Sequence, residues 1–296
     1  MAPRLLLLAC VVACLGPAAA ADDETWRVQL DDTLVQPGDV VRVVVAPPAA
    51  AASLRARWGD QEVPFVRDGA GRWLALLGID VAEPPGPRVL RLSASAASGA
   101  RLDHDASIQV AVRRVRTRRL RVHPRFVTPP KSAGPRIERE AALLDELFRR
   151  SLPERLWRDG AVRPVEGVAV SGFGVRSILN GRDRGPHNGL DLAAGTGTPV
   201  HAPTPGVVVA ARDFYYSGNT VILDHGLGLF STMAHLSAID VSEGQRVDQG
   251  TLLGRVGATG RVTGPHLHWA VRLHGARVDP LSLLEALQAP PPPIAK

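Results

Sequence analysis

The sequence is organised around three short segments, His187-Asn-Gly-Leu-Asp191, Met233-Ala-His235-Leu236 and Gly264-Pro-His266-Leu-His268. Together they supply four histidines and one carboxylate. Imidazole and carboxylate groups hold catalytic zinc ions, usually with three protein ligands and a water in the fourth position. The three segments therefore predict a site for a single zinc ion.

The spacing of these residues favours their convergence on one point. An Asn-Gly dipeptide lies between His187 and Asp191, so a turn or bulge is expected there rather than a helix. His266 and His268 are two apart in an expected strand. Their imidazoles should therefore face the same side, while Leu267 points to the core. Only one of the two needs to bind the metal.

The chemistry of this set suits hydrolysis of an amide bond. The two cysteines, Cys10 and Cys14, lie in an N-terminal segment expected to be removed, so two histidines and an aspartate are the natural ligands. Zinc would lower the pKa of a bound water toward about 7 and polarise a carbonyl oxygen. His235 and one of the His266/His268 pair would then move protons or stabilise the tetrahedral intermediate.

The N-terminus predicts a secretory signal peptide over residues 1–21. Met1–Arg4 is a short basic start, and Leu5–Leu15 is an apolar run too short to span a bilayer. Cleavage near Ala21 would export the protein to the periplasm or cell envelope and leave it without a thiol. The alternative is a lipoprotein, because Val-Val-Ala-Cys14 resembles a lipobox that would place a lipid anchor at Cys14. No later segment predicts a transmembrane span.

Composition favours strands and turns in a basic globular chain. Glycine (29) and proline (25) are abundant, and 45% of the residues are hydrophobic. The formal net charge is +6, carried almost wholly by arginine, since lysine occurs only at Lys131 and Lys296. A basic surface favours an anionic partner such as an acidic wall polymer. Export argues against nucleic acid.

Residues 25–112 predict a β-sandwich domain of the immunoglobulin-like kind. Short runs of β-branched and aliphatic residues alternate with Pro-Gly, Asp-Gly and Pro-Pro-Gly turns, as in antiparallel sandwiches. The Cys…Trp…Cys pattern of antibody domains is absent. His104, between two aspartates, is expected in a turn rather than at a metal. The runs are Val28 to Leu30, Val40 to Val45, Trp73 to Leu77, Val89 to Leu92 and Ile108 to Val112.

Residues 113–160 predict an Arg-rich linker and then an amphipathic helix. Seven arginines fall between Arg113 and Arg125. Since Val115 and Leu120 interleave with them, we interpret the segment as the solvated edge of a strand. The alternative is a patch that attracts an anionic polymer.

The helix is expected from Ile137 to Leu152. Apolar residues recur there at helical spacing with charges on the opposite face. Pro135 precedes its first turn and Pro153 follows its end. This helix is expected to pack against the domain that follows.

Residues 161–287 predict a compact, mostly antiparallel β domain, and residues 288–296 form a Pro-rich tail. Short strand-like runs alternate with turn dipeptides such as Pro205-Gly206. The loop from Asn180 to Pro186, which carries Arg182, Asp183 and Arg184, is expected to form one wall of the substrate groove.

The histidine segments resemble the lysostaphin-type zinc metallopeptidases, which cut peptidoglycan peptides. His187-x-x-x-Asp191, Ala234-His235-Leu236-Ser237 and Gly260-x-x-x-Gly-Pro-His266-Leu-His268 occur intact and in order. The resemblance covers about residues 162–285, and a β-sandwich ahead of the catalytic domain resembles secreted members as well. It also includes Gly195-Thr-Gly-Thr-Pro-Val, Gly218-Asn-Thr-Val, Asp224-His-Gly-Leu-Gly and Gly250-x-x-x-Gly254.

The resemblance implies a role for five residues. Met233 stands where the family usually has tyrosine, which puts a contact in the substrate cleft in doubt. By resemblance the zinc ligands are His187, Asp191 and His268, and the catalytic histidines are His235 and His266.

The sequence therefore predicts a secreted zinc endopeptidase that acts on peptidoglycan stem peptides or cross-bridges. The alternative is a non-catalytic activator of another wall hydrolase, which would be expected to lack ligands that this chain retains. A third interpretation, a binding module for an anionic wall polymer, rests on the Arg-rich linker. The sequence makes no prediction of oligomeric state.

The remaining polar residues of interest are expected to be structural or to lie beside the groove. Asn219 is assigned to a turn. Arg176 is expected either to approach the cleft or to pair with an acid, and Tyr215 and Tyr216 either to pack in the core or to line the groove. The other histidines assigned to structure are His123, His201, His225 and His274.

Overall fold

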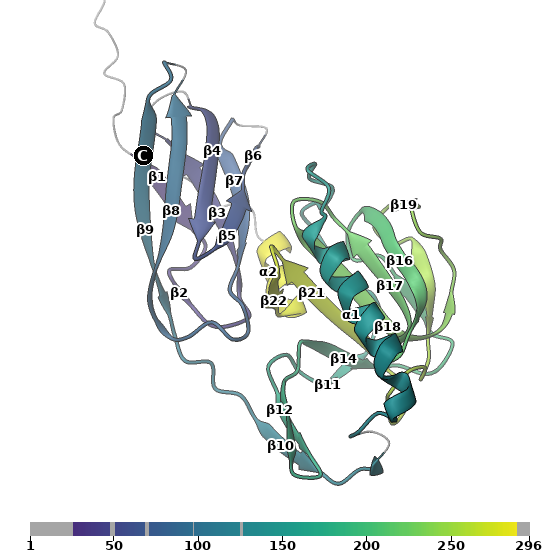
Figure 1. The fold of residues 1–296 in the computed structure, drawn as a ribbon. Helices are drawn as coiled ribbons and strands as arrows, with labels where there is room; N and C mark the ends of the chain where they lie inside the picture. Colours follow the sequence, from purple (N-terminus) through teal and green to yellow (C-terminus); the bar gives the residue numbers. More distant parts are fainter. Residues whose placement is uncertain (1–25, 48–50, 69–70, 97, 125–126, 289–296) are drawn as a thin grey trace, which may run out of the picture.

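The computed structural model describes residues 26–47, 51–68, 71–96, 98–124 and 127–288. The expected signal peptide, with Cys10 and Cys14, and residues 289–296 of the tail lie outside the described residues. The described chain forms two β-rich bodies, and the long helix α1 (Gly134–Arg149) lies on the second one (Figure 1). Strands predominate, as the sequence predicted. No helix among the described residues is long and apolar enough to cross a membrane.

The N-terminal body is a sandwich of two sheets. One has the strand order β1-β3-β7-β6 and the other β2-β9-β8-β4-β5, and only β2 and β9 pair in parallel. Both sheets contribute to one core, with Val43 and Leu77 from the first and Leu90 and Ile108 from the second. The strands are β1 (Arg27–Leu30), β2 (Leu34–Val35), β3 (Val40–Ala46), β4 (Ala51–Trp58), β5 (Gln61–Pro64), β6 (Val66–Arg67), β7 (Trp73–Gly78), β8 (Gly86–Ala96) and β9 (Arg101–Val110).

The structure corrects two expectations for the sandwich. The hairpin of β4 and β5 was not expected, because β4 is rich in alanine and arginine, which favour strands weakly. Its Leu54, Ala56 and Trp58 nevertheless alternate into the core. The expectation of a turn at His104 is wrong, because His104 lies within β9 and stacks on Trp26 with ring centroids 5.4 Å apart.

The C-terminal body is built on a ten-stranded antiparallel sheet, in agreement with the mostly antiparallel β domain that the sequence predicted. Its main path is β11-β14-β21-β18-β17-β16-β19, with β20 and β22 paired to β18 and β21 and with β15 paired to β20. The strands are β11 (Val168–Ser171), β14 (Gly189–Ala193), β15 (Pro199–His201), β16 (Gly206–Phe214), β17 (Gly218–Asp224), β18 (Leu229–Ile239), β19 (Arg246–Val247), β20 (Leu252–Val256), β21 (Leu267–Leu273) and β22 (Ala276–Val278).

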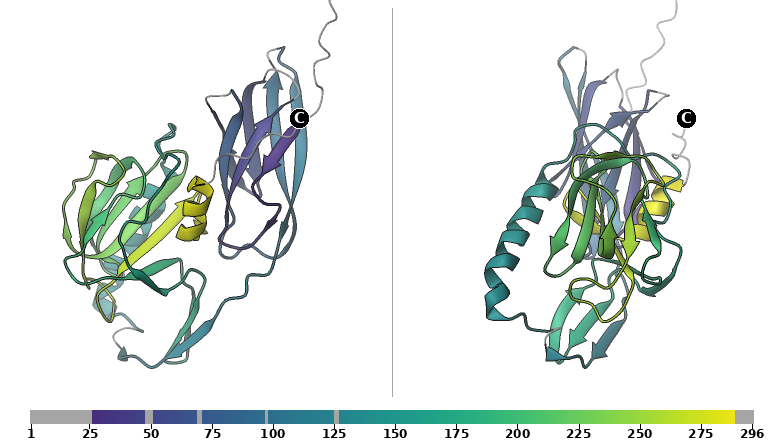
Figure 2. Two further views of the ribbon diagram at one scale, coloured as in Figure 1. Left: turned by 180° about the vertical axis from the view of Figure 1, so that it is seen from behind. Right: turned by 90° about the vertical axis from the view of Figure 1, so that its right-hand side faces the viewer.

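Helix α1 covers one face of this sheet (Figure 2), so the expectation that it packs on the following domain is confirmed. The short 3₁₀ turn η2 (Lys131–Ala133) precedes it. Leu152 was expected in the helix but lies beyond it, since its backbone N–H and the Ser151 hydroxyl donate to the Asp224 carboxylate at 2.7 Å each. The apolar face of α1 carries Leu143, Leu144, Leu147 and Phe148, which pack on Phe214, Ile222 and Phe230.

Helix α2 (Pro280–Gln288) lies between the sandwich and the large sheet (Figures 1 and 2). Leu283 and Leu287 of α2 share one core with Val40 and Val44 of β3. The sandwich and the C-terminal body are therefore packed through buried apolar side chains. Polar links reinforce the contact, namely Arg277 with Asp80 at 2.7 Å, Arg113 with Asp279 at 2.6 Å and Arg42 with Asp159 at 2.8 Å.

The Arg-rich linker contributes a strand of its own, β10 (Thr117–Leu120). It pairs in parallel with β12 (Arg176–Leu179), which pairs antiparallel with β13 (Arg182–Pro186). This three-stranded sheet projects from the C-terminal body (Figure 1). All four residues of β10 are exposed, in agreement with a solvated strand edge.

Candidate functional site

Three neighbouring strands place the predicted site residues side by side. In the pairing of β14 with β21, Asp191 lies directly opposite His268. On the other side of β21, His268 lies opposite Ala234 of β18, next to His235. Leu267 is fully buried, while the flanking His266 and His268 are partly exposed. The expected alternation of this strand is therefore present.

His187 lies just before β14 and is held at both its backbone and its ring. Its N–H donates to the Val175 carbonyl at 3.0 Å. Its Nδ1 lies 3.0 Å from the Gly172 carbonyl oxygen and 3.4 Å from the Ser171 hydroxyl. Because a carbonyl can only accept a hydrogen bond, Nδ1 carries the proton and Nε2 keeps its lone pair. A hydrogen bond of this kind orients a metal-binding imidazole.

The free nitrogen of His187 meets the other two predicted ligands at one point. His187 Nε2 lies 3.1 Å from Asp191 Oδ1 and 3.2 Å from His268 Nδ1, and these last two atoms are 2.8 Å apart. Ligand atoms about 2.0–2.1 Å from a tetrahedral zinc ion are separated from one another by roughly 3.3 Å. The three side chains therefore fit a metal ion of that size.

The electrostatics of Asp191 suit a cation. Burial alone would raise the pKa of this carboxyl, but its close contacts with the His187 and His268 rings outweigh burial and hold the pKa far below its ordinary value. Asp191 is therefore an anion at any working pH. A partly buried carboxylate between two imidazoles is a strong attraction for a divalent ion.

His235 reaches the same cleft from a bulge in β18. The register between β17 and β18 shifts at this point, and His235 has φ of +66°. That left-handed conformation is uncommon for a residue other than glycine and is characteristic of functional sites. Its backbone N–H donates to the Ser217 carbonyl at 2.8 Å, which fixes the bulge.

The rings of His235 and His266 are oriented by backbone carbonyls. Nδ1 of His235 donates to the Thr259 carbonyl at 3.0 Å, and Nδ1 of His266 donates to the Gly264 carbonyl at 2.9 Å. The Nε2 atoms are therefore the free nitrogens, and His266 Nε2 lies 3.8 Å from Asp191 Oδ1. The two ring centroids are 5.0 Å apart.

Burial keeps His235 neutral. Burial first, and then the neighbouring His268 and His266, lower the pKa of His235 to about 4. At neutral pH its Nε2 is therefore an acceptor. This is the state that a proton-accepting group needs.

Thr259 is a supporting residue that the sequence did not reveal. Its hydroxyl accepts from the Asn219 N–H at 2.9 Å and donates to the Leu236 carbonyl at 2.8 Å, while its carbonyl holds His235. The available signal was the Gly-Ala-Thr-Gly run, where small residues permit a close approach of chains. An added Cβ at Gly218 would lie 2.3 Å from the Thr259 hydroxyl.

The four histidines of the site and Asp191 all line one cleft of about 570 Å³. Among the lining residues Asp191 is the one carboxylate. Tyr216 lines the cleft and is 43% exposed, so the groove interpretation holds for this tyrosine. The linker also reaches the cleft, which the sequence did not predict. The walls contain Arg118, Leu120, Val122, Val170, Leu179, Tyr216, Ser217, Arg261, Val262 and Thr263.

Other expectations near the cleft have mixed outcomes. Arg176 pairs with Asp183, so its structural interpretation is correct. The expected wall from Arg182 to Arg184 is not among the lining residues, and Leu179 lies there instead. Met233 is fully buried in the core and lies outside the cleft.

The remaining histidines in the described residues are separate from His187, Asp191 and His268, which we call the metal cluster because together they could hold an ion. His225 is fully buried beside a turn, with Nδ1 donating to the Pro205 carbonyl at 2.7 Å. His274 donates from Nε2 to the Leu227 carbonyl at 2.8 Å. Within the described ranges, the histidines and acids that could hold a metal ion together are His187, Asp191 and His268.

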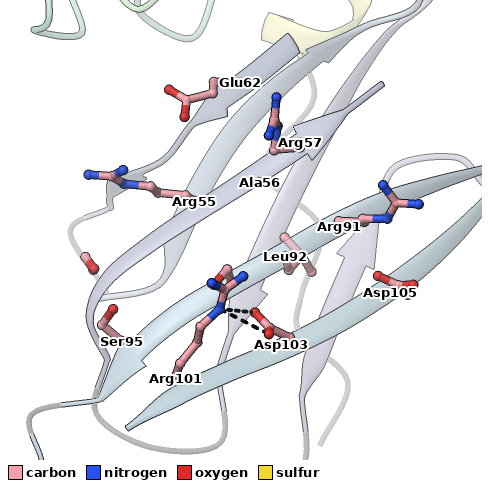
Figure 3. A pocket seen from close by; sticks show the side chains of 12 residues that line it. Arg55, Ala56, Arg57, Glu62, Arg91, Leu92, Ser95, Arg101, Asp103 and Asp105 are labelled. Atoms are coloured by element: carbon pink, nitrogen blue, oxygen red, sulfur yellow. Dashed lines mark hydrogen bonds and ion pairs between the residues drawn. The ribbon is translucent and has the colours of Figure 1, made fainter. Parts of the chain in front are cut away.

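A second hollow, of about 620 Å³, lies on the sandwich. Figure 3 shows arginine, acidic and serine side chains from β4, β5, β8 and β9 around it, whereas the Ala56 and Leu92 side chains beneath them belong to the sandwich core. Arginines and acids alternate there, and Arg101 pairs with Asp103 at 2.9 Å. Its lining holds neither histidine nor cysteine, so it offers no comparable chemistry.

Comparison with known proteins relates this cleft to peptidases. Residues 185–280 match the family described as Peptidase family M23. Peptidoglycan DD-endopeptidase ShyA of Vibrio cholerae is 47% identical over 94 residues, which cover 32% of this chain and 22% of that protein. DD-carboxypeptidase/endopeptidase Mpg of Neisseria meningitidis is 44% identical over 97 residues, covering 33% of this chain and 22% of that protein. The match thus spans about a fifth of these relatives.

A solved structure is similar over most of the chain. It is a crystal structure from Pseudomonas aeruginosa described as a candidate M23 peptidase. The two structures have a TM-score of 0.67 and 36% sequence identity, covering 87% of this chain and 97% of the other. This similarity includes the sandwich as well as the large sheet.

Proposed function

Because this chain belongs to peptidase family M23, we propose that it is an exported zinc-dependent endopeptidase that hydrolyses peptide bonds in bacterial peptidoglycan, in stem peptides or cross-bridges. The observation that carries this proposal is the convergence of His187 Nε2, Asp191 Oδ1 and His268 Nδ1 within 2.8–3.2 Å of one another. The relatives named as peptidoglycan endopeptidases support the substrate class.

In this proposal His187, Asp191 and His268 hold one zinc ion. A bound zinc ion supplies Lewis acidity, which lowers the pKa of a water and polarises the carbonyl of the scissile bond. The ring contact of His187 with the Gly172 carbonyl leaves the lone pair of Nε2 available and would orient this ring for metal binding. With two neutral imidazoles and one carboxylate as ligands, a zinc ion of charge +2 would give the site a net charge of +1.

His235 and His266 complete the site as proton carriers. With Nδ1 of each committed to a carbonyl, each presents Nε2 to the cleft. The neutral His235 accepts the proton of the attacking water. Because Nδ1 of His266 already donates to the Gly264 carbonyl, the doubly protonated form of His266 is the one that donates from Nε2 to the oxygen that gains charge when the carbonyl is attacked. The proton then passes to the leaving amine.

The proposed substrate places the enzyme in the periplasm or cell envelope. The N-terminal residues support export by their signal-peptide pattern, and lipidation at Cys14 is the alternative mode of attachment. Treatment of whole cells with a labelled lipid precursor distinguishes the two, because an anchored protein would carry the label.

The decisive experiment measures zinc content and product release together. Purified full-length protein is incubated with peptidoglycan sacculi, and the products are identified by mass spectrometry, which also names the bond. His187→Ala and Asp191→Ala should lose both zinc and hydrolysis. His235→Ala should keep zinc and lose turnover by about 10²–10⁴-fold.

His201→Ala provides the matched control, because His201 is a half-buried histidine on β15 that is outside the cleft lining. It should keep both zinc and activity. Undiminished hydrolysis by Asp191→Ala would reject the assignment. Gently purified protein that holds no zinc and releases no product would instead favour the activator alternative.

A further inference from the structure

The Arg-rich linker forms part of the wall of the active-site cleft. Strand β10 pairs with β12 in the register Arg118 with Ser177 and Leu120 with Leu179. Beyond the strand, the Asn180 side chain holds Val122 by two hydrogen bonds, to its N–H at 2.9 Å and to its carbonyl at 2.8 Å. This part of the linker is therefore fixed on the catalytic body.

Alternation along the strand selects which linker side chains face the cleft. Arg118, Leu120 and Val122 line it, whereas Thr117 and Arg119 do not. Successive residues of a strand point to opposite faces, so this pattern is the one expected for an extended segment. One arginine of the linker is thereby separated from its neighbours and directed to the cleft.

A second arginine reaches the cleft from another segment. Arg261, in the loop between β20 and β21, lies over the Tyr216 ring with 4.8 Å between the guanidinium carbon and the ring centroid. Its Nη1 atom is buried and makes no hydrogen bond within the described residues. A buried donor of this kind is costly unless a ligand satisfies it. Burial, and then the nearby Arg184, lower the pKa of Arg261, so its charge is poorly compensated.

Neither cleft arginine pairs with a carboxylate in the part of the chain that the structure describes. Arg118 donates instead to the Ser177 hydroxyl at 2.8 Å. By contrast, Arg176 on the same small sheet is paired with Asp183. The one carboxylate of the cleft lining, Asp191, belongs to the metal cluster. The cleft therefore has cationic groups without an acidic partner.

Apolar surface lies beside these cations. Leu120 is 43% exposed and Val170 is 59% exposed, although both are large apolar residues. Exposed apolar side chains in a concave site are characteristic of ligand contact. Guanidinium groups next to apolar surface suit a peptide with small side chains and a free carboxylate, since arginine binds carboxylates in two-pronged geometry.

We propose that Arg118, supplied by the interdomain linker, and Arg261 form a recognition site for a free carboxylate of the peptide substrate. This inference rests on the proposed function, because it assumes that the peptide is cut at the metal cluster. It gives the linker a role in substrate selection, and it makes an unamidated peptide the preferred substrate over its carboxamide counterpart.

The test compares two synthetic, cross-linked stem-peptide dimers, one with free carboxylates and one with the same groups as primary carboxamides. The full-length protein should prefer the free form by about tenfold in kcat/KM, mainly through KM. Arg118→Gln and Arg261→Gln should each remove about fivefold or more of this preference. Arg118→Lys should restore part of it, because it keeps charge without the planar fork.

Arg119→Gln is the matched control, since it removes the same charge from the opposite face of the same strand. It should keep the full preference. Equal loss in Arg119→Gln and Arg118→Gln would overturn the proposal in favour of a general effect of charge. Equal turnover of the two dimers by the unaltered protein would overturn it as well.

A binding measurement separates this proposal from the proposed function. Isothermal titration of each dimer into His235→Ala protein does not require turnover. If the unaltered protein hydrolyses neither dimer, the proposed function fails, while tighter binding of the free-carboxylate dimer that is lost with Arg118→Gln would still support carboxylate recognition. Equal binding of both dimers would refute it. Far-ultraviolet circular dichroism of each variant confirms that it is folded.

Discussion

Gly189→Ala should weaken metal binding, although the residue carries no side chain and binds nothing itself. Gly189 lies between His187 and Asp191 and pairs with Ala270 across β14 and β21. An added Cβ would lie 2.6 Å from the Trp269 carbonyl oxygen and 2.8 Å from Cε1 of His268. Both distances are too short for contact, so β14 must shift away or the His268 ring must rotate.

The magnitude follows from the two groups that the methyl would meet. Trp269 is fully buried, so its carbonyl has little room to move. Overpacking of this kind typically costs about 1–3 kcal/mol. At about 2–4 °C per kcal/mol, the melting temperature should fall by roughly 2–12 °C. Disturbing the support of a metal ligand typically lowers metal affinity by about 10–100-fold, and His268 is such a ligand in the proposed site.

Thermal unfolding and competition with a zinc-binding dye measure the two effects in the same samples. Gly195→Ala is the control, because the nearest atom to its added Cβ, the Thr198 hydroxyl oxygen, is 3.9 Å away. This control should behave like the unaltered protein. If Gly189→Ala binds zinc with unaltered affinity and melts at the unaltered temperature, the close packing of β14 on His268 is not what holds the cluster.

Three further predictions concern stability. Burial lowers the pKa of His225 from 6.5 to about 4, so between these pH values only the unfolded chain takes up the proton. As the pH falls through this range, the free energy of unfolding should drop by up to about 3 kcal/mol, and by less in His225→Asn. Urea titration at each pH measures this drop. Burial alone would raise the pKa of Asp80, but hydrogen bonds from Arg277 outweigh burial and lower this pKa. The stabilisation of the folded protein by the Asp80 carboxylate is therefore present above pH 3.8 and is lost as the pH falls further. Asp80→Asn should lower the free energy of unfolding by about 1 kcal/mol at pH 7 and leave it unchanged at strongly acid pH. Leu283→Ala should cost about 2–5 kcal/mol, because Leu283 is 1% exposed in the core between the two bodies, and calorimetry should show the loss; an unchanged transition would mean that α2 does not couple them.

The spacing of the site histidines and Asp191 predicted a common site, whereas the resemblance to lysostaphin-type peptidases selected His268 over His266 as the third ligand. His187 and Asp191 are close in sequence, and strand alternation alone places His266 and His268 on one side. Which atoms would face the metal could not be predicted. That depends on carbonyl acceptors such as Gly172 and on contacts between distant strands, which leave no pattern in a single sequence.

The amphipathic helix and five strands of the sandwich, β1, β3, β7, β8 and β9, followed at least in part from local sequence patterns. The strand β4 did not, since its alanines and arginines conceal the inward alternation of Leu54, Ala56 and Trp58. The pairing of β10 with β12 could not be predicted either, because Arg118 and Ser177 are far apart along the chain. Parallel strands are not joined by a tight turn, so no turn sequence indicates the pairing. Thr259 was missed because its role lies in its backbone carbonyl, which every residue has.

Because β10 pairs with β12, the linker belongs structurally to the C-terminal body, although it precedes that body in the sequence. A fragment starting at residue 161 would include the whole ten-stranded sheet yet leave β12 with an unpaired outer edge, a common cause of aggregation in excised β domains. Exchange of the sandwich for another module, by recombination or by protein engineering, would therefore have to retain residues 117–122. In a domain exchange, the linker must therefore be kept with the C-terminal body and not with the sandwich.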